Sequence, residues 1–154
     1  DRFKFKKLVK KYPKYLAYYN KNSKQRQNQK YSDAKVYNIT LNNYIGAFYS
    51  GVHQTEQHFL LLKFFEILGS GALLLLEKKS KINCDILGLV ENKHYLTIDL
   101  QADETSIMNK IKFILNPKNK KYILNIRNNG RRFCHEHLDY RYSTQNFLNL
   151  LKNI

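Results

Sequence analysis

The sequence has few cysteines and no long apolar run, and each shortage excludes a class of protein. Cys84 and Cys134 have no histidine or further cysteine at metal-ligand spacing, which argues against a zinc site and fits buried thiols in a reducing compartment. No apolar run approaches the roughly 20 residues that span a bilayer. The chain also lacks an initiating methionine and a signal-like segment. We therefore expect a cytoplasmic piece of a longer protein.

Acidic residues are scarce, and the shortage is uneven along the chain. The whole sequence has 27 lysines and arginines against 12 acidic residues, a formal charge of +15. Residues 1–30 hold 11 of the basic residues and one acidic residue, which leaves 16 against 11 for the remainder. The excess can attract phosphates, an anionic membrane surface or an acidic glycan. AT-rich coding DNA produces the same richness in lysine, asparagine, isoleucine and tyrosine, so both interpretations stay open.

The most informative stretch is residues 63–76, which reads as the end of an amphipathic helix, a glycine turn and a buried strand. Phe64, Phe65 and Leu68 share one helical face. Gly69 and Gly71 follow, and one of them is expected to end the helix in the left-handed conformation. Residues 72–76 are apolar without alternation, which is typical of a strand covered on both faces in a parallel sheet. The pattern predicts an α/β, Rossmann-like domain.

The remaining segments supply further elements around this unit. Residues 45–49 and 95–98 are predicted to be strands that join residues 72–76 in one parallel sheet. Residues 78–89 form a short helix or an irregular connection. Further helices are expected at residues 33–43, 104–115, 120–133 and 143–151, the third interrupted by Gly130. The pattern divides the 154 residues into a basic helical segment and loop at 1–31, interrupted by Pro13, and a Rossmann-like domain at 32–154.

A polar loop, residues 51–58, joins the first predicted strand to the central helix. In an α/β sheet, ligands bind at the carboxyl ends of the strands, and helix amino termini offer N–H groups to phosphates. His53, Thr55 and His58 can donate to phosphate or sugar oxygens from this loop. The alternative is a solvated loop with two surface histidines.

The order of these segments resembles the donor-binding half of glycosyltransferases with two Rossmann-like domains, the GT-B fold. In particular, it resembles the CgeB-like family and the glycosyl transferases of group 1. The likeness begins with Lys63-Phe-Phe-Glu66, followed by Gly71 and an apolar strand. It continues through residues 87–95, Asn129-Gly-Arg-Arg132 and Tyr140-Arg141, covering roughly residues 44–152.

The resemblance implies a function and a set of binding residues. The chain would be the nucleotide-sugar-binding domain of a metal-independent glycosyltransferase that transfers a sugar to a glycan, protein or lipid acceptor. An amino-terminal GT-B domain would be missing, so this chain alone would be inactive. Glu66 would bind the ribose hydroxyls, Lys63 would neutralise a phosphate, and Ser70 and Gly71 would complete the donor site. The nucleotide diphosphate sugar is the donor substrate, and no further cofactor is implied.

The sequence departs from the family pattern at two places. Related families have a second glutamate eight positions before the first, where this chain has His58, with Glu56 two positions earlier. The closing motif, a histidine followed by tyrosine and arginine, is matched by His137, Tyr140 and Arg141 at altered spacing.

Other functions fit parts of the sequence. A non-enzymatic basic module for nucleic acid or another polyanion would explain the charge. A nuclease would use Asp85 with Glu91 and Lys93, but the segment around Glu91 is typical of a turn rather than of the strand that such an enzyme needs. Lys63 and Glu66 can also be an exposed pair without a ligand.

Overall fold

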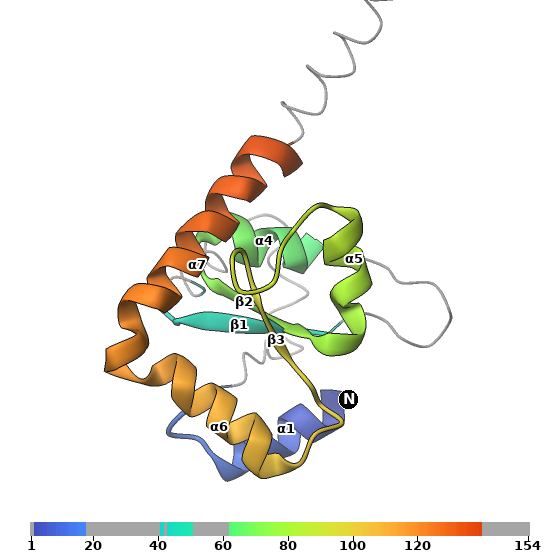
Figure 1. Cartoon of the computed structure of the whole chain (residues 1–154). Coiled ribbons are helices and arrows are strands. Elements are labelled where there is room, and N and C mark those ends of the chain that lie inside the picture. The colour runs from blue at the N-terminus through green and yellow to red at the C-terminus, as the bar shows by residue number, and fades with distance from the viewer. Residues whose placement is uncertain (1, 18–40, 42, 51–61, 140–154) are drawn as a thin grey trace, which may run out of the picture.

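The protein is an α/β domain built on a three-stranded parallel sheet (Figure 1). The structure is a computed structural model, and it describes residues 2–17, 41, 43–50 and 62–139. The strands are β1 (Gly46–Tyr49), β2 (Leu73–Glu77) and β3 (Leu96–Ile98), and they lie side by side in that order. Both pairings are parallel, with Tyr49 opposite Leu76 and Glu77 opposite Ile98. The predicted Rossmann-like parallel fold is confirmed.

The central strand β2 forms because its leucines can be buried on both faces of the sheet. Leu74 and Leu76 belong to one buried cluster, together with residues of α4 (Leu62–Ser70). Leu73 points to the opposite face, where it packs with β3, α6 (Glu104–Leu115) and α7 (Lys120–Phe133). Leu73, Leu74 and Leu76 have no exposed surface. A strand buried on both faces needs no alternation of polar and apolar residues, which explains its sequence.

Helix α4 covers one face of the sheet with the apolar side that its sequence predicts. Phe64, Ile67 and Leu68 are buried, and Phe65 packs at the margin of the same cluster. The helix ends at Ser70, and the next residue, Gly71, has a φ of +79°. An L side chain rarely adopts this conformation, so the prediction that one of the two glycines caps the helix in the left-handed region is confirmed.

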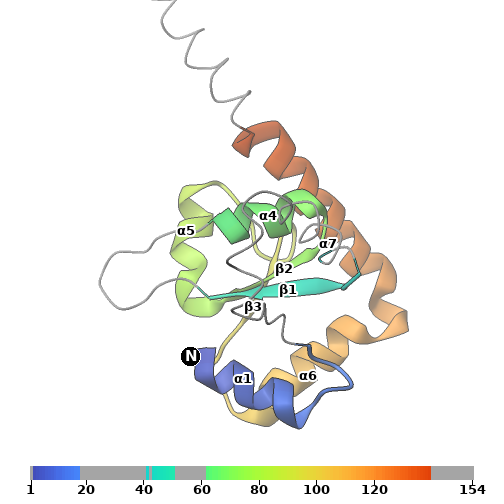
Figure 2. The ribbon, with the colours of Figure 1, turned by 180° about the vertical axis from the view of Figure 1, so that it is seen from behind.

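The opposite face is covered by α6 and by the basic helix α1 (Arg2–Lys11), as Figures 1 and 2 show. Leu8 of α1 is buried among residues of β3 and α6. The ring of Phe5 stacks on Phe48 of β1, with centroids 4.2 Å apart. Lys4 donates hydrogen bonds to the carbonyls of Leu100 and Ala102. The basic segment therefore packs its apolar side onto the sheet and keeps most of its lysines at the surface.

Helix α6 has the predicted bounds. Asp103 caps it by accepting a hydrogen bond from the backbone N–H of Ser106 at 2.9 Å. After α6, the 3₁₀ turn η2 (Pro117–Asn119) leads into α7. Between β2 and β3 lie η1 (Lys78–Ser80) and α5 (Lys81–Ile86), which agrees with the predicted short connection. The predicted helix at 143–151, and most of the one at 33–43, lie outside the described residues.

Helix α7 corrects one prediction, because Gly130 does not interrupt it. The helix continues through Phe133 into a short π-helix, η3 (Cys134–Leu138), and Gly130 is buried inside it. A Cβ at this position would lie 2.5 Å from the carbonyl oxygen of His94 and 3.1 Å from Leu68 Cδ2. The glycine is therefore explained by close packing of α7 against the chain entering β3, not by a break in the helix.

The sequence has no apolar run of the roughly 20 residues that would span a bilayer. Within the part of the chain that the structure describes, no helix is both long enough and apolar enough to cross a membrane.

Substitution of Gly130 by alanine tests the close packing of α7 against the His94 carbonyl. In an open helical position the change would stabilise the protein by about 0.5 to 1 kcal/mol. Here the overlap with the His94 carbonyl reverses the sign, and we expect Gly130→Ala to lower the free energy of unfolding by about 1 to 3 kcal/mol. Urea unfolding measures this value. Asn128→Ala, at an exposed position of α7, is the control and should leave stability unchanged or slightly higher. Equal effects of the two substitutions would contradict the packing explanation.

Candidate functional site

The two edges of the parallel sheet are differently covered. The amino edge is crossed by α7, whose Arg127 Nε donates to the carbonyl of Gly71, just before β2, at 2.7 Å. Gly130 lies against His94, just before β3. At the carboxyl edge the strands end in polar residues: Ser50 follows β1, Glu77 ends β2 and Asp99 follows β3. Because ligands of α/β sheets bind at the carboxyl ends of strands, this edge is the candidate site.

A buried polar pair lies at the centre of this edge. Ser50 is 8% exposed and Glu77 is 1% exposed. The Ser50 hydroxyl donates a short hydrogen bond to the Glu77 carboxylate. A carboxylate is costly to bury without hydrogen bonds, so the serine explains how the glutamate is tolerated in the second strand. The pair fixes the relative position of the ends of β1 and β2.

An exposed ion pair extends the edge toward β3. Lys78 Nζ lies 3.1 Å from Asp99 Oδ2. The backbone N–H of Gln101 and the Lys78 ammonium hold the pKa of Asp99 below its ordinary 3.8. Both side chains are exposed, so the pair adds little stability and its groups are accessible to a ligand. The edge thus presents a cation and a carboxylate beside the buried pair.

The sequence prediction missed Ser50, Glu77 and Asp99. Each directly follows or ends a predicted strand, and this position was the available signal. In the sequence Glu77 looks like the start of a polar segment after an apolar strand, because its partner Ser50 lies 27 residues away. A pairing between two strand ends becomes visible only with the register of the sheet.

Lys63 and Glu66 lie on α4, the helix that leads from the carboxyl edge back to the amino edge. Lys63 is exposed and Glu66 is half-buried. Two positions along a helix rotate a side chain by roughly 200°, so Glu66 points away from Phe64 and from the sheet. No ion pair joins Lys63 to Glu66 in the described part of the chain. Lys63 and Glu66 can also be interpreted as an exposed pair without a ligand, but the two side chains make no direct ionic contact with each other.

Ser70 and Gly71 lie at the other end of the same helix. The Ser70 hydroxyl donates to the carbonyl of Ile67 at 2.9 Å and accepts from the backbone N–H of Ala72 at 3.3 Å. Gly71 supplies the left-handed turn into β2 and its carbonyl binds Arg127. About 13 Å of β2 separates this turn from the carboxyl edge. The structure therefore does not bring Ser70 and Gly71 together with Glu77, and their contacts shape the turn.

Other residues named from the sequence are distributed around the molecule or lie outside its described part. His53, Thr55 and His58 lie outside the described residues, as do Tyr140 and Arg141. Arg132 donates to the Asn129 side chain at 3.0 Å. His137 is on η3, where its ring lies 4.6 Å from that of Phe133.

The amino terminus of α6 is at the carboxyl edge but is already occupied by the protein. Asp103 caps the helix, and hydrogen bonds from Ser106 hold the pKa of Asp103 below its ordinary value. Glu104 in the first turn accepts hydrogen bonds from Lys11 and Tyr12 of α1. These bonds hold the pKa of Glu104 below its ordinary value. The positive end of this helix therefore interacts with its own carboxylates.

The contacts of the nuclease-like residues do not form a metal site. Asp85 binds Lys81 on α5 at 2.9 Å, and Glu91 accepts a hydrogen bond from Thr97. Residues 92–94 form a turn, and Asn92 has a φ of +65°. Among the described residues, no group of three histidines, cysteines or acids is placed to hold a metal ion.

The cysteines are buried and free, as their sequence context indicates. Burial raises the pKa of Cys84 to about 12, so its thiol stays protonated at neutral pH. Burial also raises the pKa of Cys134. Tyr95, whose hydroxyl is buried next to Cys84, likewise has its pKa raised by burial. These groups belong to the buried core of the protein.

His94 is the buried titratable group beside α7. It is 5% exposed, and its Nδ1 accepts a hydrogen bond from the backbone N–H of Val90 at 2.9 Å. Nδ1 therefore carries no proton in this structure. The centroid of the His94 ring lies 4.9 Å from that of the Phe133 ring. Burial lowers the pKa of His94, and the positive charges of Lys93 and Arg132 lower it further.

Stability should therefore depend on pH through His94. Its folded-state pKa lies below the ordinary 6.5, so the unfolded chain binds more protons and stability falls as the pH decreases below about 6.5. We expect urea unfolding to show a loss of stability between about pH 7.5 and pH 5.5. His94→Asn, whose carbonyl can replace Nδ1 as the acceptor, should reduce this loss. The exposed His135→Asn is the control and should keep the wild-type pH dependence.

Comparison with known proteins adds no family to this geometry. A scan against protein-family models and searches of curated proteins and of solved structures each found no match to the chain. The described residues and their arrangement therefore carry the functional argument.

Proposed function

We propose that this chain is the donor-binding domain of a glycosyltransferase and binds a nucleotide diphosphate sugar at the carboxyl edge of its sheet. The observation that carries the proposal is the β1–α4–β2 unit. In this unit, Lys63 and Glu66 lie in α4, ahead of the Gly71 turn, and the helix is followed by a strand buried on both faces. Their order along the chain is the one that resembles the GT-B donor domain.

The direction of α4 decides where a donor would lie. The helix follows β1 and precedes β2, and those strands are parallel, so its amino-terminal half lies toward the carboxyl edge. The positive end of the helix dipole favours the diphosphate at that edge. Lys63, exposed in the first described turn, adds a full positive charge. In this proposal His53, Thr55 and His58 provide further donors from the segment that precedes α4 in the sequence.

Glu66 is assigned to the ribose. A carboxylate can accept hydrogen bonds from both ribose hydroxyls, and each charge-assisted bond contributes about 1.5 to 3 kcal/mol. Glu66 is half-buried, and no hydrogen bond or ion pair links it to another described residue. Such a side chain is accessible for a ligand yet partly shielded from water, which strengthens its interactions.

The strand ends would support this site rather than perform the chemistry. The buried pair of Ser50 and Glu77 fixes the ends of β1 and β2, and Lys78 with Asp99 offers exposed polar groups beside them. Ser70 and Gly71 act at a distance, by setting the turn that aligns α4 with β2. Transfer of the sugar needs an acceptor and, in the GT-B arrangement, a second domain. We propose that a glycan, protein or lipid acceptor and an amino-terminal domain fill these two roles.

Titration with nucleotides tests the assignment of Glu66. We expect uridine, guanosine or thymidine diphosphate to bind with a preference for one base. Glu66→Ala should weaken binding of the preferred nucleotide by about 2 to 4 kcal/mol, because two charge-assisted hydrogen bonds are lost. Glu66→Gln keeps the shape of the side chain and should have a smaller effect. Isothermal titration calorimetry on the three proteins provides the measurement.

Asp85→Ala is the matched control. Asp85 is an exposed carboxylate on α5 that pairs with Lys81 four residues earlier, so its removal should change stability by less than about 0.5 kcal/mol and leave binding unchanged. Binding that is equal in wild type, both Glu66 variants and the control, and that disappears with moderate salt, would contradict the donor site. It would favour the basic module, in which lysines attract phosphate without a specific pocket.

A further expectation concerns turnover. Because the acceptor site and the catalytic base of a GT-B enzyme come largely from the other domain, the chain alone should bind the donor without transferring the sugar. A coupled assay that monitors the release of nucleotide diphosphate from a nucleotide sugar, with and without candidate acceptors, measures the rate of transfer. Rapid transfer by the chain alone would contradict the proposed division of roles.

A further inference from the structure

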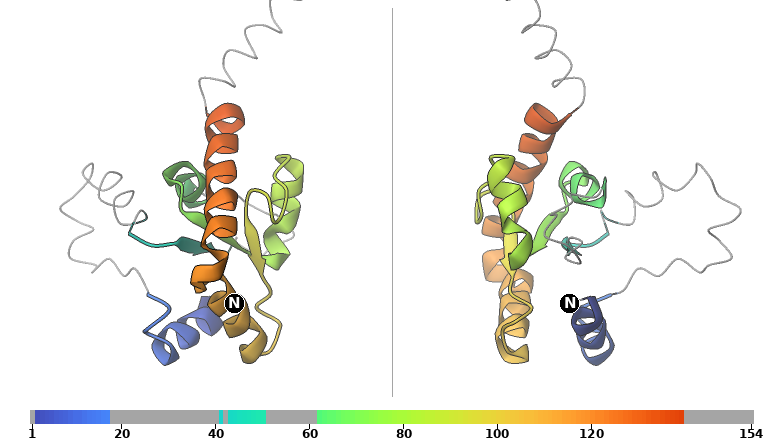
Figure 3. Two further views of the ribbon diagram at one scale, coloured as in Figure 1. Left: turned by 60° about the vertical axis from the view of Figure 1, so that its left-hand side comes forward. Right: turned by 90° about the vertical axis from the view of Figure 1, so that its right-hand side faces the viewer.

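From the second residue of α6 to the end of α7, every charged residue is basic. Residues 105–135 contain eight lysines and arginines and no acidic residue. Lys112, Lys118, Lys120, Lys121 and Arg132 are exposed. In the right view of Figure 3 the two helices follow one another along one side of the molecule. A stretch of this length without a carboxylate has no internal compensation for its charge, so it attracts a polyanion.

The outward side of α7 can be separated from its buried side. Ile123, Ile126 and Gly130 are buried against the sheet and the entry to β3. Lys121, Asn125 and Asn128 occupy the opposite side and are exposed. The arrangement is that of an amphipathic helix whose polar side carries cations and amides.

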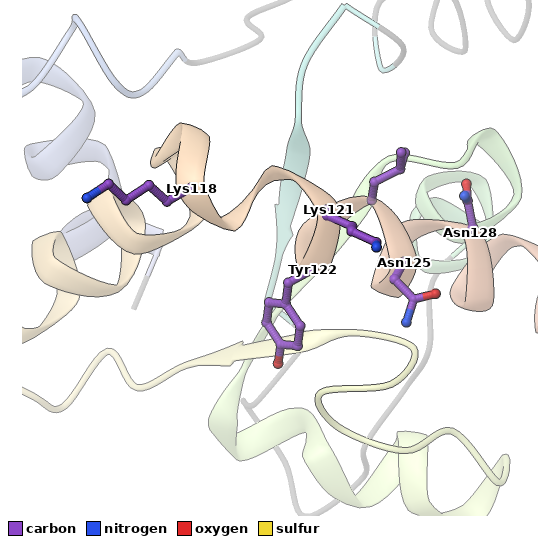
Figure 4. A pocket seen from close by; sticks show the side chains of 6 residues that line it. Lys118, Lys121, Tyr122, Asn125 and Asn128 are labelled. Carbon is purple, nitrogen blue, oxygen red and sulfur yellow. The ribbon is translucent and has the colours of Figure 1, made fainter.

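Apolar side chains are exposed within the same basic surface. Phe113 is 43% exposed, Tyr122 40% and Leu124 46%. The rings of Phe113 and Tyr122 meet edge to face, with centroids 6.2 Å apart. A hollow of about 540 Å³ lies along α7 (Figure 4). It is lined by Lys118, Lys121, Tyr122, Leu124, Asn125 and Asn128.

We propose that this surface, named here the α7 face and comprising Phe113, Lys118, Lys121 and Tyr122, binds an anionic lipid bilayer. Its lysines would interact with acidic headgroups, each cation contributing about a five-fold gain in affinity near such a surface. The two aromatic rings, which lie side by side, would enter the boundary between headgroups and acyl chains. The combination of cations with an exposed pair of aromatic rings carries the proposal.

Nucleic acid fits the same charge less well. Binding of single strands relies on free aromatic faces on which bases stack. Here Tyr122 packs against Phe113, and its hydroxyl lies 3.4 Å from the Asn92 side chain. The two rings are held edge to face, whereas insertion at a lipid boundary needs only exposed ring area.

The position of the α7 face has a consequence for orientation. Because α7 crosses the amino edge of the sheet, a bilayer on its outer side would leave the carboxyl edge pointing away from the lipid. Membrane binding and ligand binding at the carboxyl edge could therefore occur together. The inference does not depend on which ligand that edge holds.

Sedimentation with vesicles tests the proposal on the full chain. We expect binding to phosphatidylcholine vesicles that contain phosphatidylserine, much weaker binding to phosphatidylcholine alone, and a loss of binding between about 0.05 and about 0.5 M salt. Lys118→Gln with Lys121→Gln should weaken binding by about 25-fold. Lys7→Gln with Lys10→Gln removes two exposed lysines of α1 and is the matched control, expected to have a much smaller effect.

A second pair of variants tests the apolar contact. Phe113→Asn should weaken vesicle binding several-fold without changing its salt dependence, whereas Leu124→Asn, at a similarly exposed position on the other flank of α7, should not. Circular dichroism checks that each variant is folded. Equal losses for the two lysine pairs would overturn the proposal, because they would indicate attraction by net charge alone. Tighter binding to a single-stranded oligonucleotide than to vesicles, lost in the Lys118 and Lys121 variant, would also overturn it.

Discussion

Burial of β2 on both faces is the constraint on which the rest of the structure depends. A parallel central strand of leucines needs a layer of side chains above and below it, since its backbone pairs on both edges and its faces carry no polar residue before Glu77. Helix α4 and the end of α7 provide one layer, and α1, α6 and the start of α7 provide the other. The amphipathic helices, their polar outer faces and the turns between them follow from that requirement.

The same constraint separates the two edges of the sheet. Helix α7 contributes to the packing on both sides, and it can do so only by passing one edge, which is the amino edge. Its passage is close enough that Gly130 has no room for a side chain. The strand ends with polar residues are thereby left at the carboxyl edge. The placement of a candidate ligand site and of a basic outer surface on opposite sides of the sheet therefore has a single structural origin.

Charge is handled differently in the core and at the surface. Inside, the acid at the end of β2 is accommodated by the Ser50 hydroxyl, and Lys4 ends on the carbonyls of Leu100 and Ala102. Such groups are stabilised by hydrogen bonds, which burial requires. Outside, residues 105–135 of α6 and α7 carry lysines and arginines without an acidic residue among them. Such surface charge is solvated by water and therefore costs little.

The sequence by itself determined the local elements. The apolar run of β2, the amphipathic pattern of α4, the left-handed glycine and the bounds of α6 are set by neighbours within a few residues, so periodicity and turn chemistry predict them. Lys63 and Glu66 are candidates because their motif resembles that of a GT-B donor domain, and the local pattern adds only that they share one helix. The interpretation of Gly130 as a break followed the local rule, which was wrong because a distant carbonyl decides that position.

Only the tertiary structure decided which residues meet. The pairing of Ser50 with Glu77, the docking of α1 through Phe5 and Lys4, and the passage of α7 along the amino edge all join segments far apart in the chain. The same long-range packing places Ser70 and Gly71 at the edge of the sheet opposite Glu77. Sequence patterns report the spacing of residues along an element, whereas these contacts depend on sheet register and helix direction, which packing of the whole domain fixes.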